Sequence, residues 1–135
     1  METKTAEQIE QAIREDGRYP PEAYEFLHRG LEHTTRVVYG DEAPEGPRHV
    51  SGQQWCEGLR ELALQTWGPL APVVLRSWRI RTTRDFGEMV FLLIGLGLTG
   101  KQDSDRIEDF DNVYDFAEAF NSYEVALDKF DQDEE

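Results

Sequence analysis

Negative charge is distributed very unevenly along this chain. Residues 103–135 contain thirteen Asp or Glu side chains and only two basic ones, Arg106 and Lys129, whereas residues 1–102 are close to neutral. Carboxylates are costly to bury, so a core that includes the acidic end in full is disfavoured. We therefore predict one globular helical domain over residues 1–120. Residues 121–135 are predicted to form an acidic C-terminal extension that is helical in part or disordered.

The composition bounds the class of protein. A single cysteine, Cys56, cannot form an intrachain disulfide and suits a reducing compartment. The first residues lack the basic and then apolar pattern of a signal peptide, and the longest apolar stretch, 89–98, is shorter than the ~20 residues that span a bilayer. We expect a cytoplasmic protein without a membrane segment. Its oligomeric state is not fixed by the sequence.

Glycine, proline and capping residues divide the chain into helical segments. Thr5 with Gln8 and Ser51 with Gln54 have the spacing of a capping box, and Gly17 is suited to ending the first helix. Apolar residues at helical spacing follow each start signal. The pattern predicts helices over 6–16, 21–39, 53–67, from Pro69 to Trp78, and 83–95. Within these helices, Val38, Leu70 and Val73 are expected to belong to the core-facing stripes.

The segment 83–96 is apolar nearly all round, which is typical of a buried central helix. After Gly97 the pattern changes. Residues 98–102 and 107–116 are candidates for two short strands, and residues 115–129 for a last helix. The fold class that we predict is mainly α: a compact bundle of five to six helices around the buried central helix, with a small winged-helix-like β-hairpin near 98–114.

One cluster of positive charge stands out in this acidic chain. It comprises, within nine positions, Arg76, Trp78, Arg79, Arg81 and Arg84. The arginine fork is suited to bidentate contact with a phosphate, a nucleic acid or an acidic peptide. The same arginines could instead pair with the protein's own excess of carboxylates. The sequence leaves both interpretations open and favours the second.

A winged-helix regulator is the alternative that the order of segments suggests. In such proteins a recognition helix enters the major groove of DNA. Here that helix would offer Arg84 together with two acidic residues, Asp85 and Glu88, and the hairpin would carry more acids than bases. A net charge of −14 repels phosphate backbones. Nucleic acid is therefore disfavoured as a partner.

Signals for catalysis are weak. The sequence contains no nucleotide-binding loop and no Cys or His pair at metal-ligand spacing, so we expect no catalytic residue, metal or cofactor. His49 precedes Cys56 by seven residues, without the signature of a cysteine hydrolase. Ser51 fits a helix cap. The remaining candidates for a functional role are His49, Ser51, Asp85 and Glu88.

Several strings in the middle of the chain are distinctive. In order, they are Tyr19-Pro-Pro-Glu-Ala-Tyr24, His49-Val-Ser-Gly-Gln53, Leu59-Arg-Glu-Leu62, Trp78, Thr83, Asp85-Phe-Gly-Glu88 and Val113-Tyr-Asp-Phe116. With these strings the chain resembles a family of uncharacterised bacterial proteins described as restricted to verrucomicrobia and planctomycetes. The resemblance covers roughly residues 7–120. It implies a bacterial, cytoplasmic protein, and it brings no activity, cofactor or catalytic residue with it.

Taken together, these patterns predict a non-catalytic cytoplasmic adaptor that binds another protein. The arginine cluster and the acidic, aromatic C-terminal region are its expected contact surfaces. The nucleic-acid-binding regulator remains the alternative. An enzyme would become the better interpretation if His49, Cys56 or the Asp85/Glu88 pair converged in one pocket.

Overall fold

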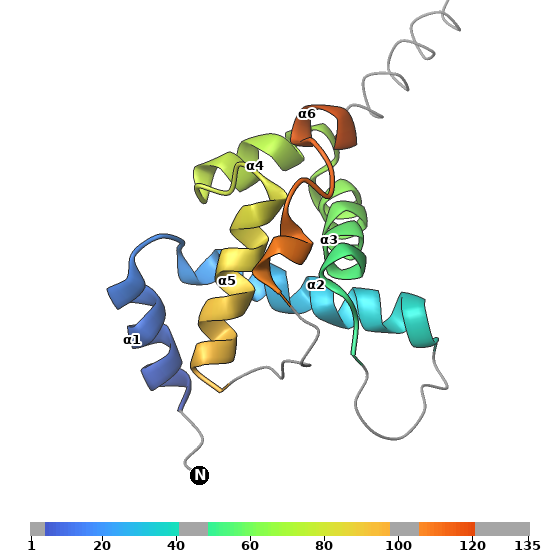
Figure 1. Cartoon of the computed structure of the whole chain (residues 1–135). Coiled ribbons are helices and arrows are strands. Elements are labelled where there is room, and N and C mark those ends of the chain that lie inside the picture. Colours follow the sequence, from blue (N-terminus) through green and yellow to red (C-terminus); the bar gives the residue numbers. More distant parts are fainter. Residues whose placement is uncertain (1–4, 41–48, 98–105, 121–135) are drawn as a thin grey trace, which may run out of the picture.

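The structure is a computed structural model that describes residues 5–40, 49–97 and 106–120 (Figure 1). Every regular element in these ranges is a helix. In chain order they are α1 (Ala6–Asp16), α2 (Pro21–Tyr39), α3 (Gly52–Trp67), the 3₁₀ helix η1 (Gly68–Leu70), α4 (Ala71–Ser77), α5 (Thr83–Gly95), the 3₁₀ helix η2 (Ile107–Phe110) and α6 (Phe116–Ala119). The prediction of a mainly helical fold is confirmed.

The starts of α1 and α3 follow from the capping signals. The Thr5 hydroxyl accepts from the Gln8 amide at 3.1 Å, and the Gln8 side chain accepts from the Thr5 amide at 2.8 Å. Ser51 and Gln54 repeat both contacts at 3.1 and 2.8 Å. Each box satisfies two amides that the first turn of a helix leaves without a partner. Gly17 ends α1 with a φ of 73°, in the left-handed region that glycine enters without strain.

Helices α2 and α3 make the most extensive contact between helices in the described fold, and each contributes a glycine to their crossing. A Cβ placed on Gly30 would collide with the Leu59 side chain, and one placed on Gly58 would collide with the Thr34 hydroxyl. The buried Trp55 adds a hydrogen bond from its indole nitrogen to the Leu27 carbonyl at 3.1 Å. The two glycines therefore let the backbones approach closely, and this crossing holds much of the core.

Helix α5 is buried over its first half. Phe86, Met89 and Val90 are inaccessible or nearly so, whereas Leu92 and Leu93 in the following turn are partly exposed. The burial of the first half agrees with the apolar pattern, whereas the second half is less buried than the predicted central helix would be. Among the described residues, the wider core extends along the chain from Ile13 to Phe120.

The predicted returning strand over residues 107–116 is wrong. Residues 107–110 form η2, and Phe116 begins α6. Instead of pairing with a strand, the Phe110 ring packs over Gly87 and Gly52, which provide room for it. The Thr83 hydroxyl donates to the Phe110 carbonyl at 2.6 Å. Residues 98–102, the other predicted strand, lie outside the described residues, as does the part of the predicted last helix beyond residue 120.

None of the described helices is both long enough and apolar enough to cross a membrane.

Candidate functional site

The structure divides the predicted arginine cluster. Arg84 forms ion pairs with Glu88 at 3.2 Å and with Asp111 at 3.0 Å. Arg79 donates to the Gly17 carbonyl at 3.0 Å from a backbone with a φ of 67°. Two of the four arginines are therefore held by the protein's own acceptors. For Arg84, these contacts agree with the interpretation that the arginines pair with the protein's own carboxylates.

The other two arginines, Arg76 and Arg81, are exposed. Within the described ranges, neither guanidinium has a hydrogen bond or an ion pair. The backbone amide of Arg81 donates to the Asp85 carboxylate at 2.8 Å. The guanidinium groups of this cluster that no described acceptor holds are therefore those of Arg76 and Arg81.

Trp78 is half-buried and belongs to an aromatic cluster with Phe26 and Trp67. Its ring centroid lies 5.9 Å from that of Phe26 and 5.5 Å from that of Trp67. These separations and tilts are typical of favourable aromatic packing. Trp78 consequently anchors the end of α4 on the core and is not a free surface aromatic.

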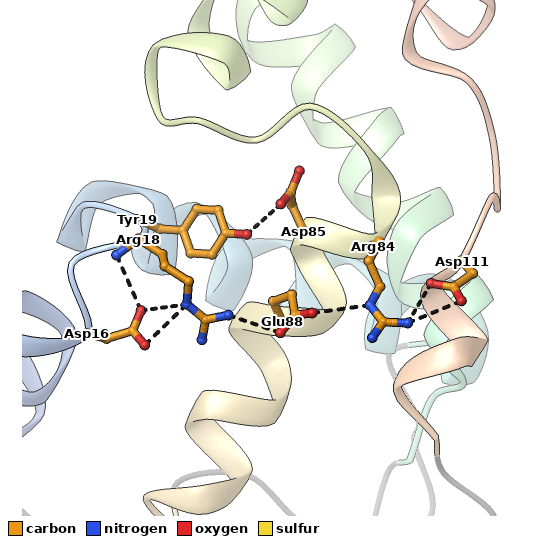
Figure 2. Close-up of polar contacts among 7 residues, drawn as sticks. All are labelled: Asp16, Arg18, Tyr19, Arg84, Asp85, Glu88 and Asp111. Atoms are coloured by element: carbon orange, nitrogen blue, oxygen red, sulfur yellow. Dashed lines mark hydrogen bonds and ion pairs between the residues drawn. The ribbon is translucent and has the colours of Figure 1, made fainter.

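Asp85 and Glu88 lie on α5 beside the turn that connects α1 and α2, as Figure 2 shows. A continuous row of ion pairs runs from Asp16 to Arg18 (3.0 Å), from Arg18 to Glu88 (3.0 Å), and through Arg84 to Asp111. The carboxylates hold the pKa values of both arginines above their ordinary range, Asp16 acting most strongly on Arg18 and Asp111 on Arg84. The row links three segments that are distant in sequence.

Asp85 has three donors of its own. One carboxylate oxygen accepts from the amides of Arg81 and Thr82 at 2.8 and 3.0 Å. The other accepts from the Tyr19 hydroxyl at 2.5 Å. Burial and this carboxylate together raise the pKa of Tyr19 well above its ordinary value. Asp85 thus caps α5 and ties the α1–α2 turn to it, which is a structural task.

Charge reversal tests this division of the cluster. We expect Arg84→Glu to lower the thermal midpoint by a few degrees, because it would place a third carboxylate beside Glu88 and Asp111. Arg81→Glu should lower it less, since the Arg81 guanidinium has no ion pair within the described ranges. Differential scanning fluorimetry at low and high salt measures both midpoints. The gap between the variants should narrow as salt screens the exposed charges, and equal midpoints at low salt would contradict the division.

The predicted candidates around the start of α3 do not form a catalytic group. Ser51 is occupied as the cap of α3. The His49 carbonyl accepts from the Tyr39 hydroxyl at 2.5 Å. His49 also lines a cavity of about 30 Å³ whose wall contains neither Cys56, Asp85 nor Glu88. Across the described part of the chain, no group of three or more His, Cys, Asp or Glu side chains is arranged to hold a metal ion.

Cys56 is fully buried on α3. Burial, reinforced by the nearby Glu57 charge, raises the pKa of its thiol to about 12. The thiolate is the reactive form of cysteine, so this group is protonated and unreactive at neutral pH. Burial also raises the pKa of Tyr24 to about 12.

Thiol labelling and alkaline titration follow from these shifts. We expect a disulfide reagent to label native Cys56 at pH 8 at least ~100-fold more slowly than the urea-unfolded chain, because reaction requires opening of the core. Rapid labelling of the native chain would contradict the burial of Cys56.

The folded state keeps protons on Cys56 and Tyr24 that the unfolded state releases above roughly pH 8.5 and pH 10. The contribution of these two groups to stability should therefore be constant below pH 8 and fall as the pH rises toward 12. Urea unfolding across this pH range measures how the free energy of unfolding changes.

The aromatic residues at the start of the acidic region are engaged with one another. The Phe116 ring centroid lies 5.9 Å from that of Tyr114 and 5.6 Å from that of Phe120. The Tyr114 hydroxyl also donates to the Cys56 carbonyl at 2.7 Å. Up to residue 120, these aromatic side chains pack on the domain.

Four large apolar side chains within the described ranges are exposed, and for three of them, Val38, Leu70 and Val73, the prediction of a core-facing position is wrong. Their exposed fractions are 62% for Val37, 39% for Val38, 60% for Leu70 and 59% for Val73. Helical periodicity identified the stripes but not their limits, because a stripe is buried only where a neighbouring element covers it. Leu70 and Val73 extend past the core along η1 and α4.

Comparison of the chain with known protein families, curated proteins and solved structures finds no match. The resemblance to the verrucomicrobial and planctomycete family remains a prediction, and it assigns no role to any residue.

Proposed function

We propose that this protein is a non-catalytic protein-binding module that contacts its partner through an exposed face of η1 and α4. This α4 surface consists of Leu70, Val73 and Arg76. The observation that carries the proposal is the exposure of Leu70 and Val73, at 60% and 59%, followed three positions after Val73 by an exposed arginine whose guanidinium has no hydrogen-bond or ion-pair partner in the described ranges.

The spacing of the three residues supports a single contact surface. Residues three positions apart lie on one side of a helix, and Leu70, Val73 and Arg76 follow each other at that interval. Contiguous exposed apolar groups are typical of interaction sites, whereas isolated ones are common on any surface. Arginine is enriched in protein interfaces because its guanidinium pairs with carboxylates through two hydrogen bonds. The expected partner segment combines apolar and acidic side chains.

The winged-helix alternative is less well supported. Arg84 is the only basic residue of α5, and both Glu88 and Asp111 compete with a phosphate for its guanidinium. A DNA-reading helix needs several free basic side chains. The acidic region beyond residue 120, which the sequence suggested as a second contact, lies outside the described residues and contributes no contact to this proposal.

Site-specific photo-crosslinking in cells of the source organism tests the proposal. A photoreactive amino acid at position 73 should capture a protein that the same group at position 7, on the exposed face of α1, does not capture. Arg76→Glu in the position-73 protein should reduce that product. The captured protein, purified, should bind the Leu70→Ser and Arg76→Glu variants roughly 10-fold more weakly than the original chain in calorimetry.

Three results would overturn the proposal. Capture at position 73 that does not exceed capture at position 7 would show that the α4 surface is unoccupied. Unchanged affinity of both variants would place the contact elsewhere. A product with the mass of two copies of this chain would identify the α4 surface as a self-association interface.

A further inference from the structure

A second surface lies where α2 and α3 diverge beyond their close crossing. The helices touch at Gly30 and Leu59 and at Thr34 and Gly58. Past that contact a groove of about 250 Å³ opens between the end of α2 and the first turns of α3. Its lining residues, here called the α2–α3 groove, are Thr34, Val37, Val38, Gln53, Gln54, Glu57, Gly58 and Glu61.

Apolar atoms and negative charge share this groove. Val37 is the most exposed of the large apolar side chains in the described ranges, at 62%, and Val38 is 39% exposed. Glu57 is exposed, and its carboxylate makes no hydrogen bond or ion pair with any described residue. Glu61 lies 2.9 Å from His33 and keeps 45% of its side chain accessible. Among the described residues, no Lys or Arg lines the groove.

We propose that the α2–α3 groove binds a basic amphipathic segment of a partner protein. The apolar side of that segment would cover Val37 and Val38, and its Lys or Arg side chains would lie beside Glu57 and Glu61. An amphipathic helix in a hydrophobic groove is a recurrent mode of peptide recognition, and complementary charge at the rim selects the partner. The charge preference is the reverse of that expected at the α4 surface.

The two surfaces share no residue. The groove uses the first ten residues of α3, whereas α4 begins after its last residue, Trp67. A helix rises 1.5 Å per residue, so the part of α3 that follows the groove, residues 62–67, adds about 9 Å along the helix between the groove and η1. The proposed groove does not depend on the α4 surface, and either could fail without the other. With both, the module would bridge an acidic and a basic partner.

A defined peptide provides the test with the full chain. The probe is a fluorescent, helix-forming peptide of leucine and lysine with an apolar stripe, and its comparison is a scrambled peptide of the same composition without the stripe. We expect the amphipathic peptide to bind roughly 10-fold more tightly in fluorescence anisotropy. It should shift the backbone amide resonances of Val37, Val38 and Glu57 in a nitrogen-15 correlation spectrum.

Matched variants separate the groove from overall charge. Glu57→Lys and Glu25→Lys change the net charge equally, but Glu25 lies on α2 outside the groove. Glu57→Lys and Val37→Ser should each weaken binding at least ~5-fold, and Glu25→Lys less than ~2-fold. Circular dichroism confirms that each variant is folded. The proposal is wrong if the scrambled peptide binds equally well, if Glu25→Lys weakens binding as much as Glu57→Lys, or if the shifted resonances lie away from the groove.

Discussion

Thr83→Val is expected to lower the free energy of unfolding by about 2–4 kcal/mol. The Thr83 side chain is completely buried, and its hydroxyl both donates to the Phe110 carbonyl at 2.6 Å and accepts from the Val113 amide at 3.1 Å. Valine has nearly the same shape but no hydroxyl. The substitution therefore leaves two backbone groups without their partner and creates no cavity to confuse the result.

Thr83→Ser is the matched control because it keeps the hydroxyl and removes one methyl group. It should cost about 1 kcal/mol, the amount expected for a buried methyl group. Urea unfolding followed by tryptophan fluorescence measures both variants. Hydrogen exchange of the Val113 amide should accelerate in the valine variant and much less in the serine variant. If the serine variant is as unstable as the valine variant, the hydroxyl does not hold this segment.

The same hydroxyl explains why the sequence predicted the helices well and residues 106–116 poorly. A capping box such as Ser51 with Gln54 acts over three residues, so its pattern is visible in a short window of sequence. The path of residues 107–113 depends on Thr83 and Gly87, which are more than twenty residues away. Nothing in the local alternation of apolar residues records such a contact.

The candidate site was predictable to a similar degree. The concentration of arginines around Trp78 was visible in the sequence, as was the excess of acids that could pair with them. Which arginine finds a partner depends on tertiary geometry: Arg84 reaches Asp111 across 27 positions, whereas Arg76 reaches no acid in the described ranges. The exposure of Val73 was also hidden, because a periodic stripe does not indicate where the covering element ends.

Gly58→Ala is the second substitution with a large expected effect. An added Cβ would occupy the position of the Thr34 hydroxyl, which donates to the Gly30 carbonyl at 2.6 Å. Overpacking of a close helix crossing typically costs 1–3 kcal/mol. The displaced hydrogen bond adds about 1 kcal/mol, which roughly equals the gain from the better helix propensity of alanine. The expected net loss is about 1–3 kcal/mol in urea unfolding.

A double-mutant cycle with Thr34→Ala shows whether the collision itself causes the loss. Thr34→Ala removes the hydroxyl but leaves the Thr34 Cβ position, 2.9 Å from the added Cβ, occupied. Gly58→Ala should therefore cost about 1 kcal/mol less in that background, with part of the loss remaining. Gly95→Ala is the control for helix propensity, because among the described residues no atom outside the neighbouring helix backbone lies within 4 Å of its added Cβ. It should be neutral or stabilise the protein by up to about 1 kcal/mol. If Gly58→Ala behaves like Gly95→Ala, α2 and α3 are not in the close contact on which both the core and the groove beside it depend.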